Sequence, residues 1–483
     1  MKPSEYDLDE PIVAIATALV PSALGIVRTS GKGAIELVAR AFSRPEALRS
    51  ASGGTLVHGW VLAPAKDVAG MKQEKSEREK IDEVVLAVYR APKSFTGEDA
   101  VEITGHGGPA TVLAVYRALV AAGFRPAERG EFSLRAFANG KADLTRTEAI
   151  REIIDAKTDE ARGHAADRLA GSLSAEIGEI KAMITRVLAA IGVEIEYPED
   201  EETTHGAFDS SLVEEASARL RVLESAWAVE KMYQDGARVV LAGKTNAGKS
   251  SLFNALLKED RAIVSDVHGT TRDWLESTAD FAGIPVRVFD TAGLRETTDL
   301  VEAEGVDRSR SLAGHADLVL YLVDATAGLS ADDSEFLERA YGDKTAIILV
   351  WNKADKTGAL PTPAIFSAQD GAIAYSAIPC SAKTGAGIEA LVAEAARLLM
   401  GDKGERDLRN VRSGAPGSER QKIAIETANA FLVHAIAAAT QGFPKDAIEQ
   451  DLEEALSALG EITGEVTSSD ILDAIFSGFC VGK

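Results

Sequence analysis

The sequence predicts a multidomain chain of mixed α/β and α class, in which a domain with a mostly parallel sheet is inserted into a helical domain. The 483 residues are too many for a single hydrophobic core. From residue 237 to about residue 400, apolar strand-like runs alternate with helical stretches, which is typical of a parallel sheet with crossover helices. Sequence rich in Ala, Glu and Leu at helical spacing lies on both sides of that region.

Before the first helical stretch, residues 1–139 predict an N-terminal α+β domain. One helix begins with Pro and ends with Gly, as helix termini favour. A charged stretch at 65–83 lacks apolar periodicity and predicts a solvated loop. The predicted strands are 11–18, 23–30 and 99–105, and the predicted helices are 33–42 and 109–123.

The remaining boundaries follow from where strand signals vanish and return. Residues 140–235 predict the first half of the helical domain, with a further helix at 211–235. Residues 236–402 form the inserted domain, and a polar linker occupies 401–420. Residues 403–483 predict the second helical half, which packs against the first, and a short tail.

Composition excludes several classes of protein. A hydrophobic content of 46% with 26% charged residues indicates a soluble globular protein. The net charge of −23 argues against a general nucleic-acid binder, so an RNA substrate would need a local basic patch or a more basic partner. Two cysteines cannot build a disulfide framework, which suits a reducing cytoplasm. The acidic start lacks the apolar core of a signal peptide.

The string "GKTNAGKS" (243–250) fits a phosphate-binding loop between a strand and a helix. Its glycines allow backbone N–H groups to face a β-phosphate. Lys249 would place a cation on the β- and γ-phosphates, and the Ser250 hydroxyl would bind Mg²⁺. The start of the following helix adds partial positive charge.

Four further motifs follow in the order found in GTPases: "GTTRD" (269–273), "DTAG" (290–293), "NKAD" (352–355) and "SAK" (381–383). Thr271 is the expected second Mg²⁺ ligand, and Asp290 would hold the Mg²⁺ shell while Gly293 senses the γ-phosphate. The Asp355 carboxylate would accept hydrogen bonds from guanine N1–H and its N2 amine, which adenine lacks. The five motifs together predict a GTPase.

Two residues refine this prediction. Leu294 follows "DTAG", where many GTPases place a Gln that orients the attacking water. A leucine cannot do so, and the enzyme therefore needs another water-positioning group. Asn246, inside the phosphate loop, offers a side-chain oxygen to a cation.

With these motifs, three flanking strings make the chain resemble the MnmE (TrmE) family of tRNA modification GTPases over essentially its whole length. They are "SFTGEDAVEITGHGG" (94–108), "GEFSLRAFANGKADL" (130–144) and "EITGEVTSSDILDAIFSGFCVGK" (461–483). The resemblance implies a Ras-like G domain and N-terminal domains that dimerise and bind a tetrahydrofolate one-carbon donor. It also implies an MnmG-type FAD flavoprotein partner in a cytoplasmic heterotetramer that holds the tRNA mainly through that partner. The pair would add an aminomethyl or carboxymethylaminomethyl group to C5 of the wobble uridine, U34.

The resemblance also assigns site residues. K⁺ between two facing G domains would replace an arginine finger, with Asn246, Ser265, the Val267 backbone and Thr270 as its ligands. Mg²⁺ would be held by Ser250 and Thr271, and Glu302 would organise the attacking water. Folate would contact Arg28, Glu102, Lys141 and Lys483. The full GTP-binding set is Asn246, Ala247, Gly248, Lys249, Ser250, Ser251, Ser265, Asp266, Val267, His268, Gly269, Thr270, Thr271, Asp290, Thr291, Ala292, Gly293, Asn352, Lys353, Ala354, Asp355, Ser381, Ala382 and Lys383.

The chain ends on "FCVGK", which places Cys480 beside its terminus. Prenylation is disfavoured because the second position after the cysteine is Gly482, which is not aliphatic. The alternatives are packing as a small hydrophobe, or delivery of the thiol to a site in the N-terminal domain. The segment before it predicts a helix capped by Thr467 or Ser468 and ended by Gly478, followed by a short mobile tail.

Plainer interpretations remain open. Arg28, Glu102, Lys141 and Glu302 are, on residue type alone, ordinary surface charges. Cys380 fits a buried thiol without chemistry, and His106 fits either a proton carrier or a structural residue between glycines. The rival function is a ribosome-assembly or regulatory GTPase without folate chemistry.

Overall fold

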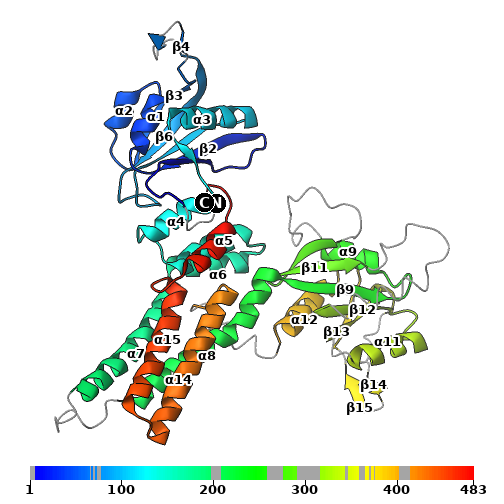
Figure 1. Cartoon of the computed structure of the whole chain (residues 1–483). Coiled ribbons are helices and arrows are strands. Elements are labelled where there is room, and N and C mark those ends of the chain that lie inside the picture. The colour runs from blue at the N-terminus through cyan, green and yellow to red at the C-terminus, as the bar shows by residue number, and fades with distance from the viewer. Residues whose placement is uncertain are drawn as a thin grey trace. The chain divides into compact units, whose positions relative to one another are not determined.

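The computed structural model describes residues 6–65, 67–68, 71–72, 78–196, 208–257, 276–290, 316–342, 346–357, 365–368, 371–374, 376–401 and 414–482. The chain divides into two compact units (Figure 1). The terminal unit comprises Met1–Arg151 and Ser457–Lys483, and the central unit comprises Glu152–Leu456. The α+β, helical and parallel α/β parts predicted from sequence are all present.

The terminal unit contains a six-stranded sheet in the order β3-β6-β7-β2-β1-β8. All neighbours are antiparallel except β1 and β8. Helices α1 and α3 cover one face, where Val38 and Leu119 pack against Val27 and Ile103 (Figure 1). The bounds are β1 Ile12–Ile15, β2 Ser22–Ser30, β3 Thr55–Leu62, β6 Lys80–Tyr89, β7 Ala100–Gly107, β8 Arg125–Pro126, α1 Ala34–Arg40, α2 Pro45–Arg49 and α3 Pro109–Ala122.

The opposite face of this sheet carries exposed apolar side chains. Leu24, Leu56 and Val85 are 61%, 72% and 38% exposed, whereas their strand neighbours Val57 and Val84 are buried. This alternation is that of a sheet packed on one side only. We call Leu24, Leu56 and Val85 the outer apolar face.

The solvated loop predicted at 65–83 is wrong in part. Within it, β4 (Asp67–Val68) pairs with β5 (Met71–Lys72), and β6 begins at Lys80. The strand was hidden by its charge, because Asp82 occupies an inward position of β6 that apolar residues usually fill. The Asp82 carboxylate is nevertheless paired there, with His106.

The end of the chain adds helices to the terminal unit. Helix α16 (Ser469–Ser477) is capped by Ser468, whose hydroxyl accepts the Ile471 N–H, and it ends at Gly478 as predicted. Its buried residues Ile475 and Phe476 pack with Tyr6, near the chain start. Helix α4 (Glu131–Ala138) and the first residues of α5 (Leu144–Asp155) complete this cluster.

In the central unit, long helices occupy the two regions that the sequence predicted to be helical, before and after the inserted domain. Helices α7 (Ser172–Glu196), α8 (Ser210–Asp235) and α14 (Glu419–Gln441) lie side by side (Figure 1), joined by α6 (Asp159–Ala170) and by α15 (Lys445–Thr463). By length and composition α14 is apolar enough to span a membrane, which is weak evidence when found for one helix. Ala428, Leu432 and Ala435 of this helix are buried, and α14 contacts α8.

The inserted α/β region forms a second six-stranded sheet in the order β10-β11-β9-β12-β13-β16. Every pair is parallel except the edge pair of β10 and β11, which the sequence analysis had not predicted. The strands are β9 Ala237–Gly243, β10 Glu276–Phe281, β11 Ile284–Asp290, β12 Leu318–Asp324, β13 Ala346–Asn352 and β16 Ser376–Pro379. The other elements are α9 Lys249–Leu256, α11 Ala331–Gly342, η4 Ala354–Lys356, α12 Ile388–Met400 and the pair β14 Ile365–Ala368 with β15 Gly371–Ala374.

The points where the chain leaves and re-enters the helical part lie together. Gln234, at the end of α8, donates from Nε2 to the carbonyl oxygen of Gly417 at 3.0 Å. The Gly417 N–H is in turn bonded to the buried side chain of Gln421. Adjoining ends of this kind allow one domain to be inserted into another without disturbing the host helices.

Candidate functional site

The phosphate loop joins β9 to α9 through glycines that no other residue can replace. Gly243 and Gly248 have φ values of +128° and +101°, in the left-handed region. A Cβ on Gly243 would lie 2.3 Å from the Leu322 carbonyl oxygen, and one on Gly248 would lie 2.1 Å from Asn352 Nδ2. The loop is therefore pressed against its neighbours, with the start of α9 facing the phosphate position.

Lys249 folds over this loop. Its Nζ donates to the carbonyl oxygens of Gly243 and Lys244 at 2.8 and 2.9 Å. Asn246 adopts a left-handed φ of +65°, and Ser250 and Ser251 open α9. The cation, the amide and the hydroxyl predicted to act on phosphate and metal thus come from one short segment.

Asn352 connects the phosphate loop with the "SAK" loop. Its Nδ2 donates to the Ala247 carbonyl oxygen at 2.8 Å, and its Oδ1 accepts the Ala382 N–H at 3.0 Å. The side chain is buried, so these bonds are shielded from water. Asn352 therefore fixes the phosphate loop and the "SAK" loop relative to each other.

Lys353 has two acceptors near the same loop. Its Nζ donates to the Asn246 carbonyl oxygen at 2.8 Å and to Asp324 Oδ2 at 2.7 Å. The hydrogen bonds from Lys353 and Thr326 lower the pKa of Asp324 to about 2. Asp324 at the end of β12 was not predicted as a site residue, and it has no motif of its own.

Asp355 is set up to accept hydrogen bonds. The Ser381 hydroxyl donates to Asp355 Oδ1 at 2.7 Å, and this bond lowers the pKa of the carboxyl. The side chain stays exposed and ionised. An ionised carboxylate beside the phosphate loop is the acceptor that guanine N1–H and N2–H₂ require.

The nucleotide residues predicted from sequence fall into two groups. Asn246, Ala247, Asn352, Lys353 and Ala382 are linked by the hydrogen bonds above, with Gly248, Lys249, Ser250, Ser251, Ala354, Asp355, Ser381 and Lys383 in the same loops. Asp290 ends β11 opposite Leu241 of β9. Ser265, Asp266, Val267, His268, Gly269, Thr270, Thr271, Thr291, Ala292, Gly293, Leu294 and Glu302 lie outside the described residues, as does Lys483.

In the terminal unit, Arg28 and Glu102 face each other across β2 and β7. Arg28 Nε lies 3.0 Å from Glu102 Oε1, and the Tyr89 hydroxyl donates to Glu102 Oε2 at 3.4 Å. The guanidinium carbon lies 5.3 Å from the centre of the Phe95 ring and 5.0 Å from that of Phe132. Cation–π attraction fixes the guanidinium between these rings.

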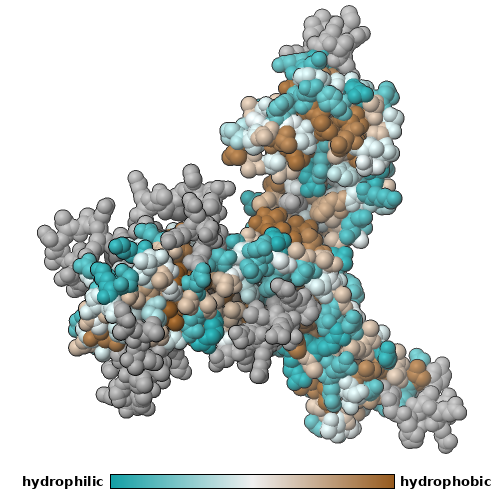
Figure 2. All heavy atoms as spheres, turned by 180° about the vertical axis from the view of Figure 1, so that it is seen from behind, coloured by the Kyte–Doolittle hydropathy of each residue, from teal (hydrophilic) through white to brown (hydrophobic). Residues whose placement is uncertain are grey.

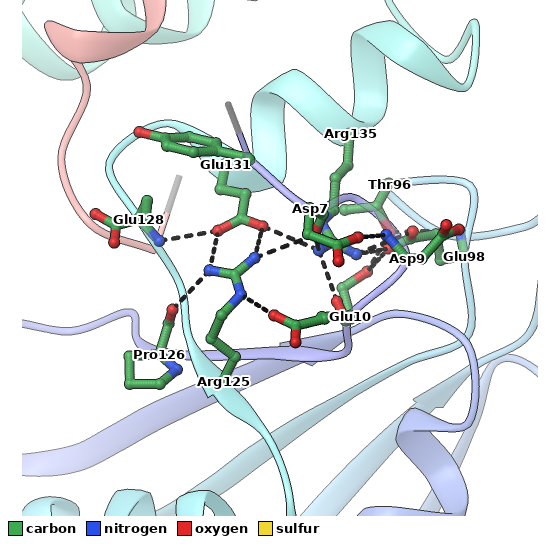
Figure 3. Close-up of polar contacts among 12 residues, drawn as sticks. Asp7, Asp9, Glu10, Thr96, Glu98, Arg125, Pro126, Glu128, Glu131 and Arg135 are labelled. Carbon is green, nitrogen blue, oxygen red and sulfur yellow. Dashed lines mark hydrogen bonds and ion pairs between the residues drawn. The ribbon is translucent and has the colours of Figure 1, made fainter. Parts of the chain in front are cut away.

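Phe132 lies on α4 between Glu131 and Arg135, two residues of a buried ion network (Figure 3). The Glu131 carboxylate binds Arg125 and Arg135, and Arg135 Nη1 reaches Glu98 Oε1 at 3.1 Å. Glu131 and Arg135 are both buried, so each charge depends on its partners. The string "GEFSLRAF" thus combines a rigid ionic base with the aromatic side chain that contacts Arg28.

The C-terminal tail, predicted from sequence as a short mobile segment, lies along this site and is held there by backbone contacts. Val481 forms an antiparallel bridge with Arg129, and Arg28 Nη1 donates to the Gly482 carbonyl oxygen at 3.1 Å. Gly482 has a φ of +93°, and a Cβ there would lie 2.9 Å from the Ile15 carbonyl oxygen. Cys480 is exposed, whereas Cys380 is buried, and its burial raises the thiol pKa to about 12.

Lys141 belongs to the terminal unit as well, but within the described residues it is not bonded to Arg28 or Glu102. Its Nζ donates to the Pro92 carbonyl oxygen at 3.0 Å. Phe95, which contacts Arg28, belongs to the same loop as Pro92. Phe95, Phe132 and Tyr89 were missed from sequence, although two of them stand inside the quoted motif strings.

His106 is paired with a residue that no motif indicated. Its Nδ1 lies 2.7 Å from Asp82 Oδ1, and its backbone N–H donates to Asp82 Oδ2 at 2.8 Å. A Cβ on Gly105 would lie 2.3 Å from Asp82 Oδ2, which explains the glycine before the histidine. The hydrogen bond and charge of Asp82 raise the pKa of His106.

Comparison with known proteins decides the family. Family models described as "MnmE helical domain" and "GTP-binding protein TrmE N-terminus" match residues 144–480 and 11–141. The chain is 52% identical over 488 residues to the tRNA modification GTPase MnmE of Treponema denticola, covering 100% of both proteins. The chain belongs to the MnmE family of tRNA modification GTPases. The Borrelia turicatae relative is 40% identical over 478 residues, 99% of each chain.

Family membership establishes a GTP-hydrolysing enzyme of tRNA modification. Solved G domains also align with the chain. The FeoB G domain of Methanococcus jannaschii is 24% identical with a TM-score of 0.24, covering 34% of this chain and 98% of that one. Aquifex aeolicus Era is 22% identical with a TM-score of 0.23, covering 40% and 66%.

Proposed function

We propose that this GTPase, with a flavoprotein partner, adds an aminomethyl or carboxymethylaminomethyl group to C5 of the wobble uridine U34, using a tetrahydrofolate one-carbon donor. The observation that carries the proposal is the Arg28–Glu102 pair, which lies beside the Cys480 tail in a chain that also holds a GTP site. The terminal unit would carry the one-carbon chemistry. The central unit would carry the hydrolysis.

The residues around Arg28 suit a reduced folate. A pterin ring presents N–H donors at one edge, which a carboxylate such as Glu102 accepts. Phe95 offers an exposed aromatic face for a flat ring, and Arg28 retains N–H donors beyond the two it uses for Glu102 and Gly482. Lys141 and Lys483 would add positive charge for the folate carboxylates.

The phosphate loop suits a second cation beside Mg²⁺. Ser250, which opens α9, would bind Mg²⁺ with Thr271, as in other GTPases of this kind. Asn246 is an exposed residue of this loop with a left-handed φ, and its amide oxygen would be a ligand for that cation. K⁺ held there with Ser265, Val267 and Thr270, when two G domains face each other, would neutralise charge on the phosphates, with Glu302 ordering water.

The outer apolar face supports a homodimer through the terminal units. Leu24, Leu56 and Val85 are exposed on an otherwise well-packed sheet, and Figure 2 shows apolar surface on this unit. Exposed apolar side chains gathered on one face favour association. An MnmG-type FAD flavoprotein would complete a heterotetramer in the cytoplasm. Because the chain has a net charge of −23, that partner would hold most of the tRNA.

Equilibrium binding of 5-formyltetrahydrofolate tests the folate proposal. Glu102→Gln removes the anionic acceptor, so its affinity is expected to fall at least tenfold, a loss of ~1.4 kcal/mol. Glu46→Gln, an exposed residue of α2 paired only with Arg49 among the described residues, is the matched control and should bind as wild type does. Absence of binding by the wild-type protein would contradict the proposal and favour a regulatory GTPase without folate chemistry.

A further inference from the structure

Arg28 joins two parts of the molecule that are far apart in sequence. One edge of its guanidinium holds Glu102 through Nε, and Nη1 holds the backbone of Gly482 at the chain end. The side chain is only 15% exposed and lies between Phe95 and Phe132, so it has little freedom to move for one partner without affecting the other.

We call the hydrogen bond from Arg28 to Gly482 the first clasp of the tail. A second clasp lies one residue earlier, at Val481. The bridge between Val481 and Arg129 is backed by Tyr6, whose hydroxyl donates to the Arg129 carbonyl oxygen at 3.3 Å. The Tyr6 ring packs with Phe476 and Phe479, which precede the tail. Tyr6 therefore contacts both the segment that pairs with the tail, at Arg129, and the helix that precedes the tail.

Cys480 lies between the buried Phe479 and the clasp at Val481. Phe479 before it is buried, and Val481 after it is bridged, so the backbone on both sides is held while the thiol stays exposed. A thiol on a free end would sample a wide volume, and ordering it at the moment of reaction would cost conformational entropy.

We propose that Tyr6 and Arg28 are positioning residues for the tail, and that Arg28 transmits the state of Glu102 to Cys480. A ligand that binds Glu102 and the Arg28 N–H groups not bonded to Gly482 would restrain the guanidinium further. Because such a ligand does not compete for Arg28 Nη1, the hydrogen bond from Nη1 to the Gly482 carbonyl oxygen is strengthened. This inference rests on the proposed folate site only for the identity of that ligand. The Glu102–Arg28–Gly482 chain of contacts exists without it.

A nitroxide spin label on Cys480 of the full-length protein reports tail motion. The only other cysteine is buried with a pKa raised to about 12, so labelling is selective. The wild-type spectrum should be dominated by slow motion. Tyr6→Phe, Arg28→Lys and Glu102→Gln should each raise the mobile-to-immobile ratio about fivefold, the factor that a typical single hydrogen bond gives. Tyr116→Phe on α3 is the control and should match wild type.

Two further measurements test whether Glu102 is coupled to the tail through Arg28. In the double variant Arg28→Lys with Glu102→Gln, mobility should rise no further than in Arg28→Lys alone, because Glu102 acts through Arg28. Saturating 5-formyltetrahydrofolate should reduce the mobile component of wild type. Glu102→Gln with a wild-type spectrum would overturn the inference, as would folate that binds by calorimetry without changing the spectrum. Folate that does not bind at all would contradict the proposed function, while the Glu102→Gln arm would still decide the inference.

Discussion

Asn352 holds the phosphate loop from behind: its side-chain amide donates to the Ala247 carbonyl oxygen at 2.8 Å. The same side chain accepts from Ala382, so a single residue sets the spacing between the phosphate-binding and base-binding loops. Its neighbours Lys353 and Asp355 contact the Asn246 carbonyl oxygen and Ser381. The "NKAD" segment therefore connects the phosphate loop with the "SAK" loop through its own side chains.

Asn352→Ala should weaken GTP binding and destabilise the G domain. It leaves the buried Ala247 carbonyl oxygen and Ala382 N–H without partners, at a cost of roughly 1–3 kcal/mol. Isothermal titration with GTP and urea unfolding measure the two effects. Asn429→Ala, which removes a bond from Ser217 in the helical part, should lower stability without changing GTP affinity. An unaltered GTP affinity in Asn352→Ala would show that Asn352 does not position the nucleotide-binding loops.

Asp355→Asn should exchange guanine for xanthine specificity. The substitution replaces an acceptor by a donor that faces guanine N1–H and the N2 amine, so GTP affinity should fall by roughly 1–3 kcal/mol or more. Xanthosine triphosphate, which carries an oxygen at position 2, should bind more tightly than to wild type. Competition titrations of the two nucleotides check this, with Asp446→Asn, an exposed residue of α15 outside the G domain, as control. Retained preference for GTP would show that Asp355 does not contact the base.

Hydrolysis should depend on K⁺ and on pairing of G domains. Leu294 cannot orient water as Gln does, and Asn246 offers an oxygen ligand, whereas the smaller Na⁺ fits the same oxygen cage poorly. Steady-state GTPase rates in KCl should exceed those in NaCl. Asn246→Ala should abolish K⁺ stimulation with GTP binding largely intact. Equal rates in the two salts would refute this account of the hydrolysis.

The sequence predicted the parts of this molecule that depend on local pattern. The strand before Gly243, the helix opening at Lys249 and the Ser468 cap were readable because turn, helix and cap chemistry lie within a few residues. The β10 edge strand and the charged start of β6 were missed, because strand pairing is decided by residues distant in the chain.

In the candidate site, residues within motifs were predictable from sequence, whereas their partners from other segments were not. Asp355 and Lys249 belong to motifs, but Asp324 and Asp82 contact Lys353 and His106 across gaps of 29 and 24 residues and have no signature of their own. The tail was predicted to be mobile because it follows a helix that ends at Gly478. Only the fold shows that Arg28, 454 positions earlier, bonds to Gly482.

His106 should make stability depend on pH above neutrality. Its pKa is raised in the folded protein by Asp82, so this stabilisation is complete below about pH 6.5, the unfolded value, and is lost as pH rises through the raised folded value. Asp82→Asn should return the His106 pKa toward its ordinary value in an NMR titration. The stability difference between wild type and Asp82→Asn should narrow as pH rises above about 6.5 and through the raised pKa of folded His106. A constant difference would argue against the pairing.

Cys480→Ser should separate the two activities of the chain. The exposed thiol has no bonded partner among the described residues, and both clasps on the tail are backbone contacts at its neighbours. Folding, dimerisation and GTP hydrolysis should remain near the wild-type level, while tRNA modification should be abolished. Circular dichroism, GTPase rates and complementation of a deletion strain measure these. Full modification in the variant would show that the thiol is not required for the chemistry.

The most direct test of the central claim is nucleoside analysis of tRNA from cells that lack this protein. If the chain supplies the C5 group of the wobble uridine, the aminomethyl-type and carboxymethylaminomethyl-type uridines should disappear from digested tRNA. Expression of the wild-type chain should restore them, and Glu102→Gln and Cys480→Ser should not. An unchanged set of wobble nucleosides in the deletion strain would contradict the account.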